Sequence, residues 1–128
     1  MKDFQHEQLF TELTPAEAAI IEGGKRITLH KVECIKANAD AGPNSDDLFI
    51  KLGGERVWGP NSIDDGLSAN LNNIGRDFGS SIRVEFRDQD TGNPDDYLGS
   101  ITASKVGRNQ TSILEGSGSK YKLFYSVT

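Results

Sequence analysis

The chain has 128 residues, of which 35% are hydrophobic and 26% are charged, and its formal net charge is −5. This length suits one domain with its own core, and the composition is ordinary for a soluble globular protein. The acidic balance argues against a nucleic-acid-binding surface, and no apolar run approaches the roughly 18–20 residues that span a bilayer. The single cysteine, Cys34, excludes a disulfide within the chain.

The distribution of charge divides the chain into two parts. Residues 1–24 hold five acidic residues and one lysine, a net −4, whereas residues 25–128 hold fourteen acidic and thirteen basic residues, a net −1. The first ten residues lack the basic start and apolar stretch of a secretory signal peptide, so we expect no Sec-type signal. We therefore treat residues 1–24 and 25–128 as separate units.

The segment before the glycine pair has the pattern of a short helix. Thr14 is placed as the N-cap, Pro15 as the first helical residue and Glu17 as the glutamate of a capping box. Gly23 is the expected C-terminal stop. A helix of this length is only marginally stable alone. Two interpretations are open: a helix that packs on the following domain, or a detachable segment that ends at Gly23-Gly24.

The same segment resembles the double-glycine leader of bacteriocin-like and nitrile-hydratase-type precursors, and its ELTPAEAA stretch is similar to cyanobacterial examples. The matching positions are Leu13, Thr14, Glu17, Ala18, Ile21, Gly23 and Gly24. Ala18 departs from the pattern, because a larger apolar residue is commoner there. The resemblance implies that the peptidase domain of an ABC exporter recognises the leader and cuts after Gly24. It also implies a bacterial protein that is secreted, to the medium or the cell surface, after leader removal.

From Lys25 onward the pattern predicts β-strands. KRITLHKVECIKA is rich in β-branched and apolar residues, and its alternation changes phase near His30-Lys31, which indicates a β-bulge. DLFIKLGG and ERVWG read as two strands joined at Gly53-Gly54. Residues 82–87 and 121–127 alternate apolar with polar side chains, as strands with one buried face do. Short strands between Gly-, Asn-, Asp- and Pro-containing loops indicate an all-β antiparallel sandwich or barrel.

Two loops between the predicted strands are rich in aspartate. They hold Asp40, Asp46 and Asp47 in the first loop, and Asp88, Asp90, Asp95 and Asp96 in the second. Ca²⁺ takes six to eight oxygen ligands, so two such loops at one end of a sandwich would suit it. Neither loop contains histidine, cysteine or lysine, and we therefore expect a binding protein rather than an enzyme. Aspartate is also a common turn residue, which leaves an ordinary loop as the alternative.

The spacing of these aspartates resembles the calcium-binding loops of the C2 domain. In that family the first loop reads aspartate, five residues, aspartate, and the third reads D-x-D, five residues, aspartate, two residues, glycine. The resemblance implies a C2-like β-sandwich at 25–128 with Ca²⁺ ligands at Asp40, Asp46, Asp88, Asp90 and Asp96, the backbone carbonyl of Gln89, and Asn93 as a peripheral ligand. Asp47 departs from the proline that usually follows the second loop-one aspartate. Residues 54–80 show no match and lack the family's basic strand for phosphoinositides.

Other polar and aromatic residues are weaker candidates. His30 and Cys34 are four apart and could share a strand face, but zinc needs about four ligands, so we interpret both as ordinary strand residues. Asp64-Asp65 is interpreted as a turn. Trp58 is either a core residue or an exposed loop contact.

Three functions stay open on the sequence. The favoured one is an exported module in which Ca²⁺ orders the loops and supports binding of an unidentified protein or glycan partner. The second is calcium-dependent membrane binding, the best-known role of the resembled family. The loop tips at 41–44 and 91–94 offer no large apolar or basic side chain, so we expect little membrane docking. The third is a small secreted toxin or effector. The oligomeric state is not set by the sequence.

Overall fold

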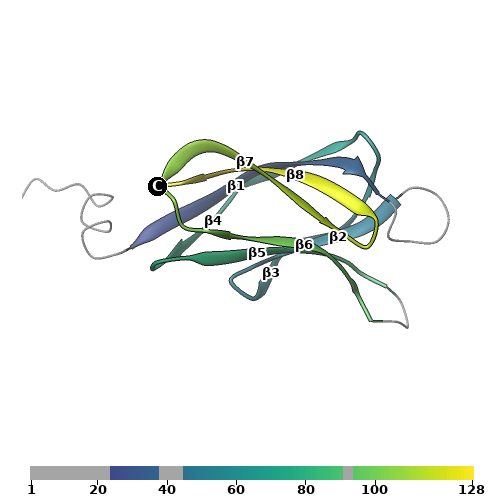
Figure 1. The fold of residues 1–128 in the computed structure, drawn as a ribbon, viewed down its shortest axis with the longest axis horizontal. Coiled ribbons are helices and arrows are strands. Elements are labelled where there is room, and N and C mark those ends of the chain that lie inside the picture. The colour runs from purple at the N-terminus through teal and green to yellow at the C-terminus, as the bar shows by residue number, and fades with distance from the viewer. Residues whose placement is uncertain (1–23, 38–44, 91–93) are drawn as a thin grey trace, which may run out of the picture.

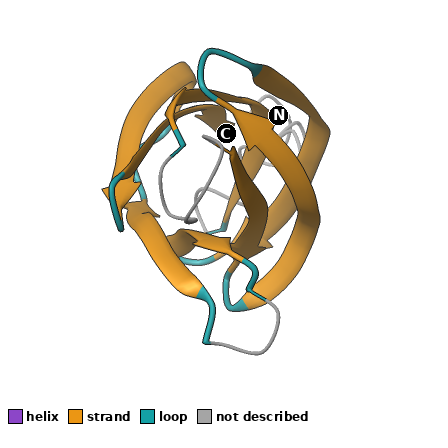
Figure 2. Cartoon of the chain, turned by 90° about the vertical axis from the view of Figure 1, so that its right-hand side faces the viewer, coloured by secondary structure: helices purple, strands orange, loops and turns teal. Residues whose placement is uncertain are grey.

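A computed structural model of the chain describes residues 24–37, 45–90 and 94–128, which form two four-stranded antiparallel sheets. The first sheet has the order β4 (Ser68–Phe78), β1 (Lys25–Lys36), β8 (Ser119–Val127), β7 (Gly107–Gly116). The second has the order β3 (Glu55–Asp64), β2 (Ser45–Leu52), β5 (Ile82–Asp88), β6 (Asp96–Ala103). The predicted all-β antiparallel sandwich is confirmed, and Figures 1 and 2 show its two layers from the side and from one end. The helix expected between Thr14 and Gly23 lies outside the described ranges.

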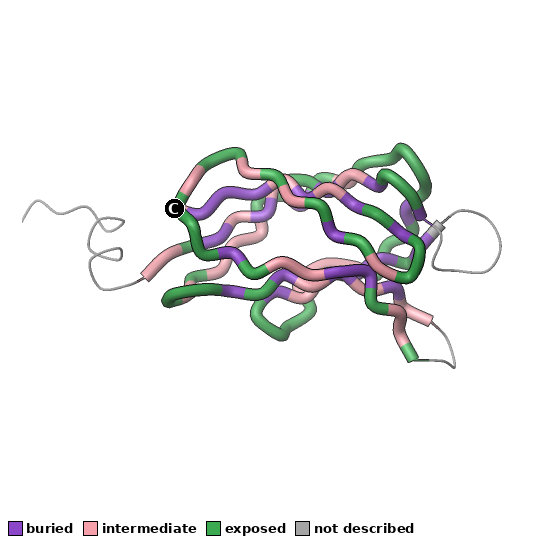
Figure 3. Tube along the Cα trace, in the orientation of Figure 1, coloured by how far each residue is buried: buried purple, intermediate pink, exposed green. Residues whose placement is uncertain are grey.

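Alternate side chains of the inner strands fill the space between the sheets. Leu48 and Ile50 of β2, Phe86 of β5, and Tyr121 and Leu123 of β8 are all fully buried. In Figure 3 buried positions alternate with more exposed ones along these strands. Each such aliphatic or aromatic side chain contributes about 1.5–3 kcal/mol on burial, so the period-two pattern predicted from the sequence builds the core.

Strand β1 changes phase at a bulge, as the sequence predicts. Its pairing with both neighbours shifts between Leu29 and Lys31, and Leu29 before the bulge and Val32 after it are both buried. The extra residue, His30, hydrogen-bonds side chains on β4 and β8 at 2.8 Å each. Cys34 is buried in the core instead, so His30 and Cys34 do not share a face.

The two ends of the sandwich hold different strand connections. At the right-hand end of Figure 1, β1 ends and β2 begins, and β5 ends and β6 begins. The aspartates flanking both predicted calcium loops therefore lie at one end. At the other end the predicted Gly53-Gly54 turn joins β2 to β3, with φ of 62° and 92°. There Arg26 and Thr128 also exchange two backbone hydrogen bonds of 2.9 Å.

The two sheets meet edge to edge where β6 passes β7. A Cβ atom at Gly99 would lie 2.6 Å from the backbone nitrogen of Glu115, and one at Gly116 would lie 2.6 Å from the carbonyl oxygen of Tyr97. Gly99 also has a φ of +123°, which L-residues rarely adopt. The glycine three residues after Asp96 therefore serves packing, because it lets the sheets close beside the aspartate loop.

Candidate metal centre

Three of the predicted ligands converge at the loop end of β5 and β6. Asp88 ends β5, Asp96 begins β6, and the two residues are directly paired in the ladder. Asp90 follows two positions after Asp88. One carboxylate oxygen from each of the three lies within 4.8 Å of the other two. Carboxylate oxygens are the ligands that Ca²⁺ prefers, so this set of donors fits a hard divalent cation.

Asp88 is held by the backbone of β2. It is fully buried, and its Oδ1 accepts a hydrogen bond of 2.6 Å from the backbone N–H of Asp47. A regular antiparallel ladder would direct that N–H to the carbonyl of Gln89, whose own N–H donates to the Asp47 carbonyl at 2.9 Å. The Asp88 carboxylate thus takes the place of the Gln89 carbonyl, which is the carbonyl predicted as a metal ligand.

Asp46 lies on β2 beside this cluster. The β2–β5 ladder ends where Leu48 pairs with Asp88, and the next residue of β2, Asp47, donates its backbone N–H to Asp88, so Asp46 lies one residue from that contact. Asp46 is fully buried, and its Oδ2 accepts a hydrogen bond from the phenol of Tyr121 on β8. It is not one of the three carboxylates that converge within 4.8 Å. Asp46 therefore stands next to the cluster and is tied to the opposite sheet.

The remaining predicted site residues fall mostly outside the described ranges. These are Asp40 and Asn93 among the ligands, and Leu13, Glu17, Ile21 and Gly23 in the leader. Gly24 is the first described residue and directly precedes β1. The roles assigned to these residues stay predictions.

Contacts on both sides of the β5–β6 loop hold its ends. The backbone N–H of Asp90 donates to Oδ1 of Asp95 at 3.2 Å, which ties the start of the loop to its end. On β3, Arg56 donates to the side-chain oxygen of Gln89 at 3.0 Å, and its guanidinium lies 3.9 Å from the ring centroid of Phe49. Arg56 is distant in sequence from the loop and belongs to no motif, so the sequence carried no signal for this contact.

A carboxylate on the outer face of β5 is paired with two arginines. Glu85 forms ion pairs with Arg87 and, at 3.2 Å, with Arg83. Burial by itself would raise the pKa of Glu85, but the hydrogen bonds and charges of Arg87 and Arg83 outweigh it and hold that pKa below 4.5. The guanidinium of Arg87 also lies 5.6 Å from the ring centroid of Tyr97, next to the cluster.

Two buried polar side chains lie beneath Asp46. Cys34 and Tyr121 face each other across β1 and β8, and the Tyr121 ring packs edge-on against Phe86 at 5.6 Å. Burial raises the pKa of the Cys34 thiol to about 11. Burial, followed by the hydrogen bond to Asp46, also raises the pKa of Tyr121. Both groups are therefore protonated at neutral pH, and the Tyr121 hydroxyl is a hydrogen-bond donor.

Two exposed apolar side chains lie at the same end, one at the end of β1 and one in the turn between β3 and β4, and sequence reasoning missed them. The carbonyl of Leu67 accepts a hydrogen bond from the backbone N–H of Cys34 at 2.8 Å, which places the turn next to the end of β1. Leu67 is 55% exposed and Ile35 is 42% exposed. Asp65 accepts a 2.6 Å hydrogen bond from the backbone N–H of Ala37, in keeping with its interpretation as a turn residue. Separately, Trp58 packs against the core while partly exposed.

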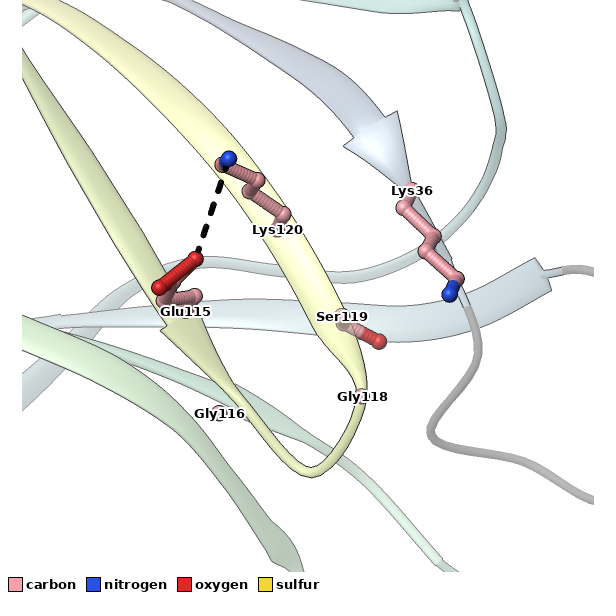
Figure 4. Close-up of a pocket in the computed structure, with 6 residues that line it drawn as sticks. All are labelled: Lys36, Glu115, Gly116, Gly118, Ser119 and Lys120. Atoms are coloured by element: carbon pink, nitrogen blue, oxygen red, sulfur yellow. Dashed lines mark ion pairs between the residues drawn. The ribbon is translucent and has the colours of Figure 1, made fainter.

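An open hollow of about 390 Å³ lies near the β7–β8 turn. It is lined by Lys36, Glu115, Gly116, Gly118, Ser119 and Lys120. In Figure 4 the Ser119 side chain points toward the Lys36 side of the hollow, and Lys120 turns toward Glu115, 4.0 Å away. The predicted ligands that the structure describes are not among the lining residues, and the lining charges are mixed.

Within the three described ranges, no helical segment has the length and apolarity that crossing a membrane requires.

Comparison with known proteins identifies the fold. Neither a protein-family model nor a curated protein sequence matches the chain. A solved structure described as a C2 domain matches with a TM-score of 0.55 and 14% identity, over 81% of this chain and 98% of that one. Human GIVD cytosolic phospholipase A2, solved with an inhibitor and terbium chloride, matches with a TM-score of 0.50 and 12% identity, over 81% of this chain but 17% of that one. The described part of this chain therefore has a C2-like fold.

Proposed function

We propose that residues 25–128 form a calcium-binding C2-like module. The observation that carries the proposal is the convergence of Asp88, Asp90 and Asp96 within 4.8 Å at the loop end of a C2-like sandwich. Asp46 and the carbonyl of Gln89 are proposed to add ligands from the adjacent strand and loop. The predicted ligands Asp40 and Asn93 would extend the set. The ion would neutralise the carboxylates and order the loops for binding a protein or glycan partner.

We also propose that the module acts by binding rather than by catalysis. The converging groups are all carboxylates, whereas an acid–base site needs groups of differing pKa and a nucleophilic site needs an activated nucleophile. The likeness to the phospholipase spans only 17% of that chain, so it brings no catalytic role here.

Export is a further part of the proposal. The leader resemblance supports removal of residues 1–24 by an exporter peptidase, followed by secretion to the medium or cell surface. Strand β1 begins at Lys25, the residue after the proposed cut, and Arg26 is bonded to Thr128 by two backbone hydrogen bonds of 2.9 Å. A peptidase must bind the chain on both sides of the bond that it cuts. We therefore propose that cleavage takes place before β1 pairs in the sheet.

Calcium titration of the full chain tests the proposed function. After metal is removed with a chelator, calorimetry should detect saturable Ca²⁺ binding with a dissociation constant of roughly 10⁻⁵–10⁻³ M, the range of sensor and extracellular sites. A ligand that binds only the folded state also raises the melting temperature. A melting temperature that is the same in chelator and in millimolar Ca²⁺ would contradict the proposal.

Calcium-dependent membrane binding is the second candidate, and the exposed pair Ile35 and Leu67 favours it. Against it, the loop tips at 41–44 and 91–94 carry no large apolar or basic side chain. We expect little Ca²⁺-dependent sedimentation with anionic vesicles at physiological salt. Strong sedimentation that is lost in chelator and in an Ile35→Ser/Leu67→Ser variant would make membrane binding the better proposal.

A further inference from the structure

We propose that Tyr121 is a positioning residue of the metal centre, which orients Asp46 from the opposite sheet. The inference rests on the proposed calcium function and assigns a role to a residue outside both aspartate loops. The phenol of Tyr121 donates a hydrogen bond to Oδ2 of Asp46, and both residues are fully buried. The contact joins residues 75 positions apart, one in each sheet.

The donor in this hydrogen bond is held in place by the core. Tyr121 lies on β8, an inner strand paired with Cys34 of β1 on one side and with Leu114 of β7 on the other. Its ring packs edge-on against Phe86 of β5, with a centroid separation of 5.6 Å and an interplanar angle of 74°. A donor that cannot move restricts the rotamers of the side chain that accepts from it, so Asp46 is oriented before any ion arrives.

A neutral donor suits this position better than a charged one. A fully buried carboxylate is costly unless it is hydrogen-bonded, so Asp46 needs a partner. An arginine or lysine would neutralise the carboxylate and compete with a cation for it. The Tyr121 hydroxyl satisfies one oxygen of Asp46 without adding a positive charge next to the cluster. Hydrogen-bond partners of metal ligands typically change metal affinity about 10–100-fold when they are removed.

The test compares two tyrosine variants of the full chain. Tyr121→Phe removes the hydroxyl and keeps the ring that packs in the core. Tyr125→Phe is the matched control: it lies on the same strand, is 7% exposed, and its hydroxyl pairs with Ser112 Oγ at 3.1 Å. With folding verified by circular dichroism, Ca²⁺ affinity is measured by calorimetry. We expect Tyr121→Phe to weaken binding about tenfold or more, and Tyr125→Phe to leave it unchanged.

A double-mutant cycle separates positioning from a purely structural role. If Tyr121 acts through Asp46, Tyr121→Phe should have no further effect on Ca²⁺ affinity in an Asp46→Asn background. Additive losses of affinity would overturn the assignment, because they would place the effect elsewhere. Affinity in Tyr121→Phe that equals or exceeds that of the control would overturn it too.

An NMR titration of the wild-type chain tests the inference without relying on the folding of any variant. The NMR signal of the ring carbon that bears the Tyr121 hydroxyl should shift as Ca²⁺ is titrated, because its acceptor becomes a ligand. A signal unaffected by saturating Ca²⁺ overturns the inference and leaves the proposed function intact. Failure of the wild-type chain to bind Ca²⁺ at all overturns both.

Discussion

Asp90→Asn should stabilise the metal-free protein and reduce the stabilisation that calcium adds. Oxygens of Asp88, Asp90 and Asp96 lie within 4.8 Å of one another. Two unit charges at that separation repel by about 0.9 kcal/mol in bulk water and about 3.5 kcal/mol at an effective dielectric constant of about 20. Asp90 and Asp96 are only half-buried, so the lower figure is the better guide. Asp90 takes part in two of the three pairs, and its neutralisation should stabilise the metal-free protein by about 2 kcal/mol.

Calcium should remove or reverse this advantage. A ligand that binds only the folded state stabilises it by about 2.7 kcal/mol at a hundredfold excess over Kd. The variant lacks one charged ligand, so its gain from Ca²⁺ should be smaller than that of the wild type. The free energy of unfolding is measured by urea denaturation in chelator and in millimolar Ca²⁺. Fluorescence of Trp58, the single tryptophan, reports the transition.

Asp95→Asn is the matched control for this comparison. Asparagine keeps an oxygen that can accept the hydrogen bond from the Asp90 backbone, and Asp95 lies outside the converging cluster. We expect Asp95→Asn to weaken Ca²⁺ binding less than Asp90→Asn does, with little change in the stability of the metal-free protein. The reasoning is refuted if Asp90→Asn destabilises the protein in chelator, or if its gain from Ca²⁺ equals that of the wild type.

Three further predictions follow from the described residues and the leader pattern. Gly99→Ala should lower the free energy of unfolding, measured by urea denaturation, by about 2–4 kcal/mol through backbone strain and a clash with β7. The control Gly54→Ala should lower it by only about 1–2 kcal/mol, because a Cβ atom there would meet nothing within 4 Å. Because the pKa of Glu85 is lowered in the folded state, its ionised form stabilises the fold above pH 4.5, and this contribution is lost as the pH falls below that value. Glu85→Gln should therefore flatten the acid side of a plot of unfolding free energy against pH. An unchanged plot would contradict this prediction. A matching exporter peptidase should release a product beginning at Lys25, and it should cut the urea-unfolded chain faster than the folded chain. Gly23→Val should block the cut. If the wild-type Gly24–Lys25 bond survives under both conditions, the glycine pair is only a linker.

Much of the β-structure could be predicted from the sequence because it depends on local periodicity. A strand with one buried face must alternate apolar with polar side chains, so the buried positions within residues 82–87 and 121–127 could be predicted from the sequence. The bulge near His30 was readable for the same reason, since the alternation changes phase there. The spacing of Asp88, Asp90 and Asp96 also predicted that these carboxylates cluster, because β5 and β6 are paired neighbours in the sheet.

Contacts between distant strands were decided by the tertiary structure alone. Periodicity tells which face a side chain occupies and not which strand lies opposite, so nothing near Asp46 in the sequence pointed to Tyr121 as its partner. Arg56 reaches Gln89, and Leu67 bonds the backbone of Cys34, for the same reason: strand order places them there. The sequence by itself predicted the strands with a clear apolar alternation and the three carboxylates that converge, but it predicted no strand at β4 or β7. The stacking of two sheets determined which buried donor holds Asp46 in place, because that neighbour is set by packing across the core.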